Sequence, residues 1–241
     1  MTSISVLCHL YYKDSLEGLL PYLKNLSGYN TRYLFNLCSD TTYHQEVRKN
    51  IYATFADAIV TCSPNVGKDI GGKLVLIDTF LKLDMTNDYL VFLHDKKSPH
   101  TATGSTWLQK LLTILVSDNI KRILNEFEHY KETGLIASNA MILNEFDAAK
   151  KQYDCSSNAE LHELRKNFGI DTESHQFVGG TMFWARASAF RQFFTTFSAL
   201  EIRAGLERGN ILDHYKGSWS HAWERMFSWI VLQEGLKLKG I

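Results

Sequence analysis

A run of charged and ring-bearing side chains directly follows a short apolar segment, YLVFL, at residues 89–93. The apolar segment predicts a buried strand, and ligands of open α/β sheets bind beyond the carboxyl ends of the strands. Lysine ammonium groups neutralise phosphate oxygens, and an aspartate can hold a divalent cation. A solvated charged turn is the alternative, but such a turn seldom follows a buried strand at once. We therefore expect a diphosphate-binding loop made by His94, Asp95, Lys96, Lys97, Ser98 and His100.

Two earlier clusters offer groups for the nucleoside of a nucleotide ligand. His9, Tyr11 and Asp40 follow the first two predicted strands, where they could stack on a base or bond to ribose. Aromatic residues at the rim of the core are the alternative. The second cluster is NVGKDIGG, where glycine allows a tight turn and the aspartate is expected to cap the next helix. Capping alone is the alternative. The binding residues predicted from this cluster are Asn65, Gly67, Lys68 and Asp69.

Two later clusters offer groups for a sugar and for proton transfer. The glycine pair in GGTMFWAR allows backbone to approach a ligand, and Trp184 offers a flat face for a sugar ring. A core strand with a glycine bulge is the alternative. Glu224 is the candidate general base, and stabilisation of a first-turn glutamate by the helix dipole is its alternative. The predicted sugar- and acceptor-binding residues are Gly179, Gly180, Thr181, Trp184 and Arg225, of which the last could also pair with Glu224 or with phosphate.

Short apolar runs alternate with amphipathic segments along the chain. This alternation is typical of an α/β fold with a mostly parallel central sheet and helices on both faces. The predicted strands are 4–12, 32–37, 58–62, 88–93, 134–138 and 177–186. The predicted helices are 16–26, 42–55, 70–83, 107–116, 119–130, 187–197 and 220–233, with 144–167 helical in part. We expect one domain over residues 1–241, in which 1–100 mainly bind nucleotide and 101–241 mainly bind sugar and acceptor.

Composition and charge argue against several classes of protein. Lysine plus arginine and aspartate plus glutamate both number 26, so no general electrostatic case exists for binding nucleic acid or an anionic membrane. No segment approaches the roughly 18 apolar residues of a membrane span, and the N-terminus lacks the basic region of a signal peptide. The 4 cysteines have no CxxC spacing, which predicts reduced thiols in a cytoplasmic protein.

Taken in order, HLYY, NVGKDIGG, LHDKKSPH, GGTMFWAR and WERMF resemble the rhamnan synthesis protein F family of bacterial glycosyltransferases. The resemblance spans about residues 4–232, and LHDKKSPH with GGTMFWAR is its most specific part. It implies a GT-A-like fold and transfer of a sugar from a nucleotide donor to a cell-surface polysaccharide, such as a rhamnan or the O-antigen of lipopolysaccharide. It also implies that the His94–Lys96 segment stands where these enzymes carry an acidic metal- and diphosphate-binding motif, and Glu224 where inverting members carry the base.

The requirement for a metal cofactor is left open, because only Asp95 is acidic in this motif and lysines follow it. Either Asp95 holds Mg²⁺ or Mn²⁺ with waters and phosphates, or Lys96 and Lys97 take the place of the metal. The implied donor is a dTDP- or UDP-sugar carrying rhamnose or another hexose, and the implied acceptor is a glycan or lipid-linked glycan. Other polysaccharide-assembly proteins are expected partners, and the expected location is the cytoplasm or the inner face of the plasma membrane.

Two other functions are weighed against this one. A phosphotransferase or hydrolase acting on nucleotides lacks the GxxxxGK[ST] loop that would support it. A non-catalytic carbohydrate-binding or scaffolding subunit of a polysaccharide assembly complex would carry a similar pocket without releasing nucleoside diphosphate. Release of nucleoside diphosphate from a nucleotide sugar therefore separates the enzyme from the binding protein.

Overall fold

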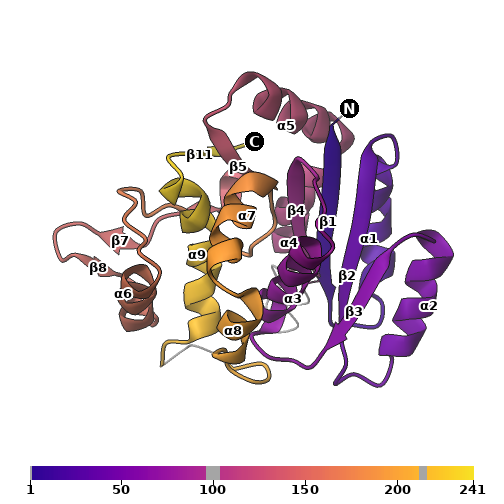
Figure 1. The fold of residues 1–241 in the computed structure, drawn as a ribbon, viewed down its shortest axis with the longest axis horizontal. Helices are drawn as coiled ribbons and strands as arrows, with labels where there is room; N and C mark the ends of the chain where they lie inside the picture. Colours follow the sequence, from indigo (N-terminus) through magenta and orange to yellow (C-terminus); the bar gives the residue numbers. More distant parts are fainter. Residues whose placement is uncertain (1, 96–103, 212–215) are drawn as a thin grey trace.

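The computed structural model describes residues 2–95, 104–211 and 216–241, which form a mixed α/β architecture (Figure 1). The α-helices are α1 (Ser15–Leu23), α2 (His44–Thr54), α3 (Lys68–Lys82), α4 (Gly104–Leu112), α5 (Ser117–His129), α6 (Asn158–Asn167), α7 (Ala187–Thr196), α8 (Ala199–Ala204) and α9 (Trp219–Gln233). The strands are β1 (Ser3–Leu10), β2 (Asn30–Cys38), β3 (Ile59–Ser63), β4 (Tyr89–His94), β5 (Thr133–Ala137), β6 (Ile142–Leu143), β7 (Phe146–Asp147), β8 (Gln152–Tyr153), β9 (Phe177–Val178), β10 (Phe183–Arg186) and β11 (Lys237–Gly240). Short 3₁₀ helices are η1 (Lys24–Leu26), η2 (Thr113–Leu115) and η3 (Asn139–Met141).

A 7-stranded sheet forms the centre of the molecule, in the order β11-β5-β10-β4-β1-β2-β3. β1 pairs in parallel with β2 and β4, and β2 pairs in parallel with β3. β10 runs antiparallel to both β4 and β5. β4 is buried along its whole length and β1 along almost all of its length, as expected for strands covered on both faces. The predicted mostly parallel α/β sheet is confirmed.

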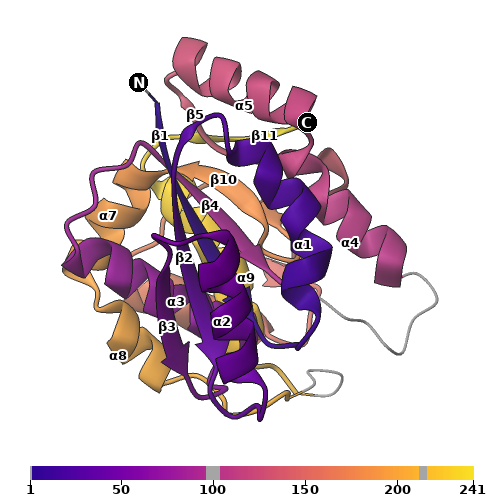
Figure 2. The same cartoon turned by 90° about the vertical axis from the view of Figure 1, so that its right-hand side faces the viewer.

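Helices cover both faces of this sheet (Figures 1 and 2). Right-handed crossovers carry α1 and α2 over one face as the chain passes from β1 to β2 and β3. The chain then returns through α3 to β4 on the far side of β1, so α3 lies on the opposite face, where α7 and α9 pack against it. On the first face, Asn25 Nδ2 donates to the carbonyl of Leu115 at 2.8 Å and joins η1 to η2.

The direction of strand addition reverses between β1 and β4. In open α/β sheets, ligands bind in the crevice outside the carboxyl ends of the strands at such a reversal point. His9 and His94 are register partners at that end of the pair. The fold therefore brings the end of the HLYY strand beside the start of HDKKSPH.

Some elements differ from the sequence prediction. The single strand predicted at 177–186 is two strands: β9 pairs with β6, and β10 joins the central sheet. The break falls at Gly180 and Thr181, whose φ angles of 78° and 44° lie outside the strand region. The elements α8 and β11 were not predicted, because each is too short to show a clear period. Within the described ranges, no helix is both long and apolar enough to cross a membrane.

Candidate functional site

A cavity of about 630 Å³ opens where β1 and β4 end. Its lining comes from these strand ends, the first turn of α3, the loop before β10 and the first half of α9. Most of the clusters that the sequence predicted to bind ligand therefore contribute residues to this one cavity. The predicted site residues that line it are His9, Tyr11, Asn65, Lys68, Asp69, His94, Asp95, Gly179, Gly180, Glu224 and Arg225.

The imidazole of His9 is held tightly at the end of β1. Its Nδ1 lies 3.1 Å from the carbonyl oxygen and 3.0 Å from Oδ1 of Asn36, and because both are acceptors, Nδ1 carries the ring proton. Gly72 of α3 lies against the ring, since a Cβ there would be 2.2 Å from Nδ1. Burial lowers the pKa of His9. The cavity is therefore lined by a neutral, oriented imidazole.

Asp95 holds together the ends of the two strands. Its Oδ2 accepts the backbone N–H groups of Tyr11 and Tyr12, each at 2.6 Å. Its own N–H donates to the carbonyl of His9 at 3.1 Å. Burial raises the pKa of Asp95, although the hydrogen bonds it accepts act in the opposite direction. One carboxylate oxygen thus shapes the turn after β1, a role that the charged motif alone does not reveal.

The NVGKDIGG motif forms the start of α3. The helix begins at Lys68, and Gly67 occupies the cap position with φ 74°. The predicted capping role of Asp69 is wrong, because this residue lies inside the first turn. A Cβ on Gly67 would lie 2.3 Å from Leu206 Cδ1, so the glycine serves packing as well as backbone geometry. Among the described residues, no side chain caps this helix end, which lines the cavity and favours an anionic group there.

A fully buried lysine, Lys73, links α3 to two other elements beside the cavity. Its Nζ lies 3.0 Å from Asp69 Oδ2 and 3.0 Å from His94 Nδ1. It donates to the carbonyl of Thr181 at 2.9 Å and also contacts the Thr181 hydroxyl. Burial lowers the pKa of Lys73. Burial also acts to raise the pKa of Asp69, but the neighbouring His94 ring and Lys73 ammonium outweigh it and hold that pKa well below its usual range.

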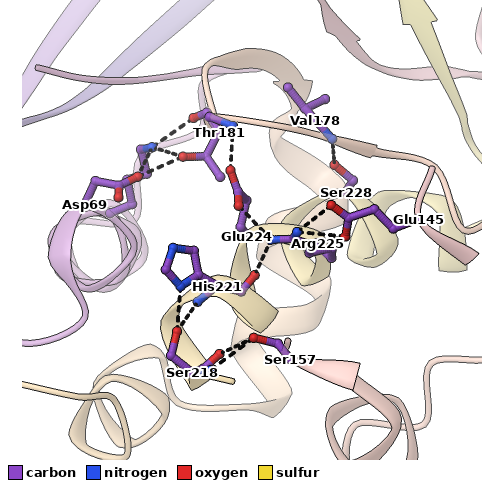
Figure 3. Close-up of polar contacts among 12 residues, drawn as sticks. Asp69, Glu145, Ser157, Val178, Thr181, Ser218, His221, Glu224, Arg225 and Ser228 are labelled. Atoms are coloured by element: carbon purple, nitrogen blue, oxygen red, sulfur yellow. Dashed lines mark hydrogen bonds and ion pairs between the residues drawn. The ribbon is translucent and has the colours of Figure 1, made fainter. Parts of the chain in front are cut away.

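Glu224 joins α9 to the loop before β10 (Figure 3). Its Oε1 accepts the backbone N–H of Gly180 at 2.5 Å, and its Oε2 pairs with Arg225 Nη1 at 2.7 Å. The residue lies in the second turn of α9, and the first turn carries no acidic residue, so the helix-dipole explanation does not apply. His221 lines the cavity from the preceding turn, with Nδ1 2.6 Å from Ser218 Oγ.

Arg225 is held between two carboxylates. Besides Glu224, it contacts Glu145, with Nη2 2.9 Å from Oε1 and 2.8 Å from Oε2. Its guanidinium carbon lies 4.4 Å from the ring centroid of Phe177. Burial acts to lower the pKa of Arg225, but Glu224 and Glu145 outweigh it and raise the pKa. The charge of Arg225 is therefore balanced inside the protein, and the residue is not a spare cation for phosphate.

Several predicted site residues lie elsewhere. Asp40 accepts the N–H of Asn65 at 2.8 Å and so supports the loop before α3 without lining the cavity. Thr181 is only 1% exposed and bonds to Lys73. Gly67 also lies outside the lining. Lys96, Lys97, Ser98 and His100 lie outside the described residues, and their roles stay predictions.

The predicted sugar-stacking role of Trp184 is wrong. Its side chain is fully buried, and its Nε1 donates to the carbonyl of Ile114 at 3.2 Å. The residue lies in β10, where it pairs in register with Val91 and Ile136 of the neighbouring strands. The ring therefore packs between the sheet and η2 and cannot meet a sugar.

Other lining residues were missed by the sequence analysis. His221 and Glu224 are three residues apart, a spacing that puts them on one face of a helix, so a longer motif, SHAWERMF, would have found the first. Glu145 gives no such local signal, because its partner is 80 residues away. The missed lining residues are Tyr12, Ile70, Trp107, Leu143, Glu145, Phe177, Asn210, Ser220 and His221.

The described donor set does not fit a divalent cation. Across residues 2–95, 104–211 and 216–241, no three His, Cys, Asp or Glu side chains are grouped to hold a metal ion. The lining carboxylates already have protein partners: Lys73 for Asp69, backbone N–H groups for Asp95, and Arg225 for Glu145 and Glu224. Mg²⁺ and Mn²⁺ require several oxygen ligands at once. No chemical step is therefore assigned to a metal at these residues.

The fold and the cavity define an α/β protein whose candidate ligand site lies at the reversal point of a mostly parallel sheet. The chain belongs to the rhamnan synthesis protein F family, whose family model matches residues 1–236. It is 29% identical over 237 residues to the uncharacterized protein WxcX of Xanthomonas campestris pv. campestris, in each of two strains. The match covers 97% of this chain and 32% of WxcX, so the chain spans about a third of the length of these relatives. The family takes its name from rhamnan synthesis.

Proposed function

We propose that this chain is a glycosyltransferase domain with a GT-A-like site, which moves rhamnose or another hexose from a nucleotide sugar to a growing cell-surface polysaccharide. The observation that carries the proposal is the convergence of Glu224, the start of α3 and the strand-end residues on one cavity at the sheet's reversal point. Nucleotides bind at such crevices in open α/β sheets. The family supplies the polysaccharide context.

The donor nucleotide is assigned to the half of the cavity formed by residues before position 100. His9, Tyr11 and Asn65 offer an imidazole, a phenol ring and an amide to the nucleoside. The uncapped first turn of α3 offers backbone N–H groups to a phosphate. Residues after position 100, including Glu224 and the loop before β10, would bind the sugar and the acceptor.

Charge is the main constraint on diphosphate binding. Among the described lining residues, Lys68 and Arg225 are the two fully basic side chains and face four carboxylates, Asp69, Asp95, Glu145 and Glu224. Since Arg225 is already paired twice, a diphosphate needs further positive charge. In this proposal Lys68 acts together with Lys96 and Lys97 of the predicted loop, and these lysines take the place of a metal.

Glu224 acts as the general base in the proposed reaction. It takes the proton of an acceptor hydroxyl while that oxygen attacks the anomeric carbon of the donor sugar. The new carbon–oxygen bond forms as the bond to the diphosphate oxygen breaks, and nucleoside diphosphate leaves with the electron pair. Attack from the side opposite the leaving group inverts the anomeric configuration. Glu145 also pairs with Arg225, so Glu224 is not the sole counter-charge of that guanidinium.

A non-catalytic carbohydrate-binding subunit is the second candidate. The observation that favours it is that both oxygens of Glu224 already accept hydrogen bonds from the protein, from Gly180 and Arg225. Each such donor occupies a lone pair that an acceptor hydroxyl would otherwise use. In either case the proposed acceptor is a glycan or lipid-linked glycan, handled with other assembly proteins in the cytoplasm or at the inner face of the plasma membrane.

Donor hydrolysis and transfer distinguish the two candidates. The chain is incubated with dTDP-rhamnose, UDP-hexoses and UDP-galactofuranose, with and without glycan acceptors, and released nucleoside diphosphate is measured. The proposal predicts release with at least one donor, increased by the matching acceptor. Binding of glycan without release from any donor would favour the carbohydrate-binding subunit.

A further inference from the structure

Lys73 lies where three elements of the site meet. Its side chain has no exposed surface, and it belongs to α3. Its Nζ reaches Asp69 on the same helix, His94 at the end of β4, and both the carbonyl and the hydroxyl of Thr181 in the loop before β10. Asp69 and His94 line the cavity, whereas Lys73 does not. A buried amine with these contacts can act on the site only through its neighbours.

The contact with Lys73 determines which nitrogen of His94 holds the proton. Nδ1 lies 3.0 Å from Lys73 Nζ and 3.6 Å from Asp69 Oδ2. An ammonium facing the ring at this distance makes Nδ1 an acceptor, so the proton sits on Nε2. Without the ammonium, the Asp69 carboxylate would favour a proton on Nδ1. The lysine therefore decides between two tautomers.

The same amine holds an unusual backbone conformation. Thr181 has φ 44°, a left-handed value that β-branched residues rarely adopt. Lys73 donates to its carbonyl at 2.9 Å, and the Thr181 hydroxyl donates to Asp69 Oδ2 at 2.9 Å. The preceding residue, Gly180, gives its N–H to Glu224. The direction of this N–H thus depends on a turn that Lys73 stabilises.

We propose that Lys73 is a positioning residue, which keeps the proton of His94 on Nε2 and keeps the Gly180 amide directed at Glu224. It would thereby couple the phosphate end of the cavity to the proposed base. The consequence for sugar transfer rests on the proposed function, whereas the tautomer and the loop geometry do not.

The tautomer is measured directly in the wild-type protein by long-range ¹H–¹⁵N correlation of the histidine rings, with His94→Gln to assign the signals. We expect an unprotonated Nδ1 and a protonated Nε2 at neutral pH. In Lys73→Met the proton should move to Nδ1, or the ring should become doubly protonated beside Asp69. Lys82→Met is the matched control, because Lys82 makes the same i,i+4 contact at 3.0 Å with Asp78 in α3 but is exposed. A wild-type ring with its proton on Nδ1 would overturn the proposal.

Hydrogen exchange of the Gly180 amide tests the second half of the proposal. We expect exchange at least about ten-fold faster in Lys73→Met and in Thr181→Val. Thr181→Val keeps the lysine, so the His94 tautomer should be unchanged in that variant. If Lys73→Met does not fold, the wild-type tautomer and Thr181→Val still decide the question. Unchanged Gly180 exchange in Thr181→Val would contradict the loop role, and neither readout requires a donor sugar or turnover.

Discussion

The backbone N–H of Gly180 donates to Oε1 of Glu224 across 2.5 Å, and so connects the loop before β10 to helix α9. The two residues come from motifs, GGTMFWAR and WERMF, that stand 44 positions apart in the chain. The orientation of the carboxylate therefore depends on the loop as much as on the helix that carries it (Figure 3). Substitutions in that loop should therefore affect the chemistry of Glu224 even when Glu224 itself is unchanged.

Glu145→Gln should lower turnover without weakening donor binding. The change removes one of the two carboxylates that balance Arg225, so the guanidinium will pair more strongly with Glu224 and compete with an acceptor hydroxyl for its Oε2. We expect kcat to fall by about ten-fold, which corresponds to about 1.4 kcal/mol, with KM for the donor little changed. Glu163→Gln, at an exposed position on α6, is the control. Unaltered kcat in Glu145→Gln would show that Arg225 does not tune the base.

Lys68→Ala, and separately the double change at Lys96 and Lys97 to Ala, should weaken binding of nucleoside diphosphate far more than binding of nucleoside. A charged hydrogen bond to phosphate contributes about 1.5–3 kcal/mol, or about 10- to 150-fold in affinity. Calorimetry with both ligands makes the comparison, and Lys49→Ala, at an exposed position on α2, is the control. Equal losses for the two ligands would argue against a lysine diphosphate site.

Stability should fall as the pH drops below the ordinary histidine pKa of 6.5, because burial lowers the pKa of His9. Below this pH the His9 imidazole binds a proton in the unfolded chain but not in the folded protein. Unfolding is therefore favoured by up to about 1.4 kcal/mol per pH unit. His9→Gln removes this contribution, and urea unfolding at about pH 7.5 and about pH 5.5 measures it. The stability gap between wild type and variant should shrink toward acid pH. His175, whose pKa burial also lowers, leaves some acid dependence in the variant. A gap independent of pH would refute the assignment.

Trp184→Phe should affect stability and not sugar binding. The variant loses the hydrogen bond to Ile114 and leaves a small cavity in a fully buried site. Together these changes are expected to cost about 1–3 kcal/mol, seen as a lower melting temperature. Donor and acceptor affinities should be the same as in the wild type once the protein is folded. Loss of sugar affinity at unchanged stability would restore the stacking role that the sequence suggested.

Much of the fold was predictable because its signals are local. The parallel strands β1 to β4 and their crossover helices show as apolar runs and 3.6-residue stripes inside single segments. The pairing of β10 against β4 and β5 is set instead by contacts between distant segments. The glycine–threonine turn that separates β9 from β10 depends on Lys73, whose contact with Thr181 spans 108 residues. Patterns within a short segment of sequence cannot reveal a contact between residues so far apart in the chain.

The candidate site was predictable to the same degree. Polar residues that follow an apolar strand, such as His9 and Asp95, are visible because the strand itself points to the ligand edge of the sheet. Trp184 was misplaced because the aromatic side chains of a buried strand and of a sugar platform look alike in sequence. Lys73 and Glu145 were missed because their roles arise from pairing with residues of other elements.

Comparison of Glu224→Gln with the wild type measures the central claim most directly. Donor turnover is followed by release of nucleoside diphosphate, and binding of nucleoside diphosphate is followed by calorimetry on the same preparations. Glutamine keeps an acceptor for the Gly180 N–H but cannot take a proton, so turnover should fall by about 100- to 10,000-fold while binding changes by less than about two-fold. A variant that keeps most of its turnover would contradict the assignment of Glu224 as the base.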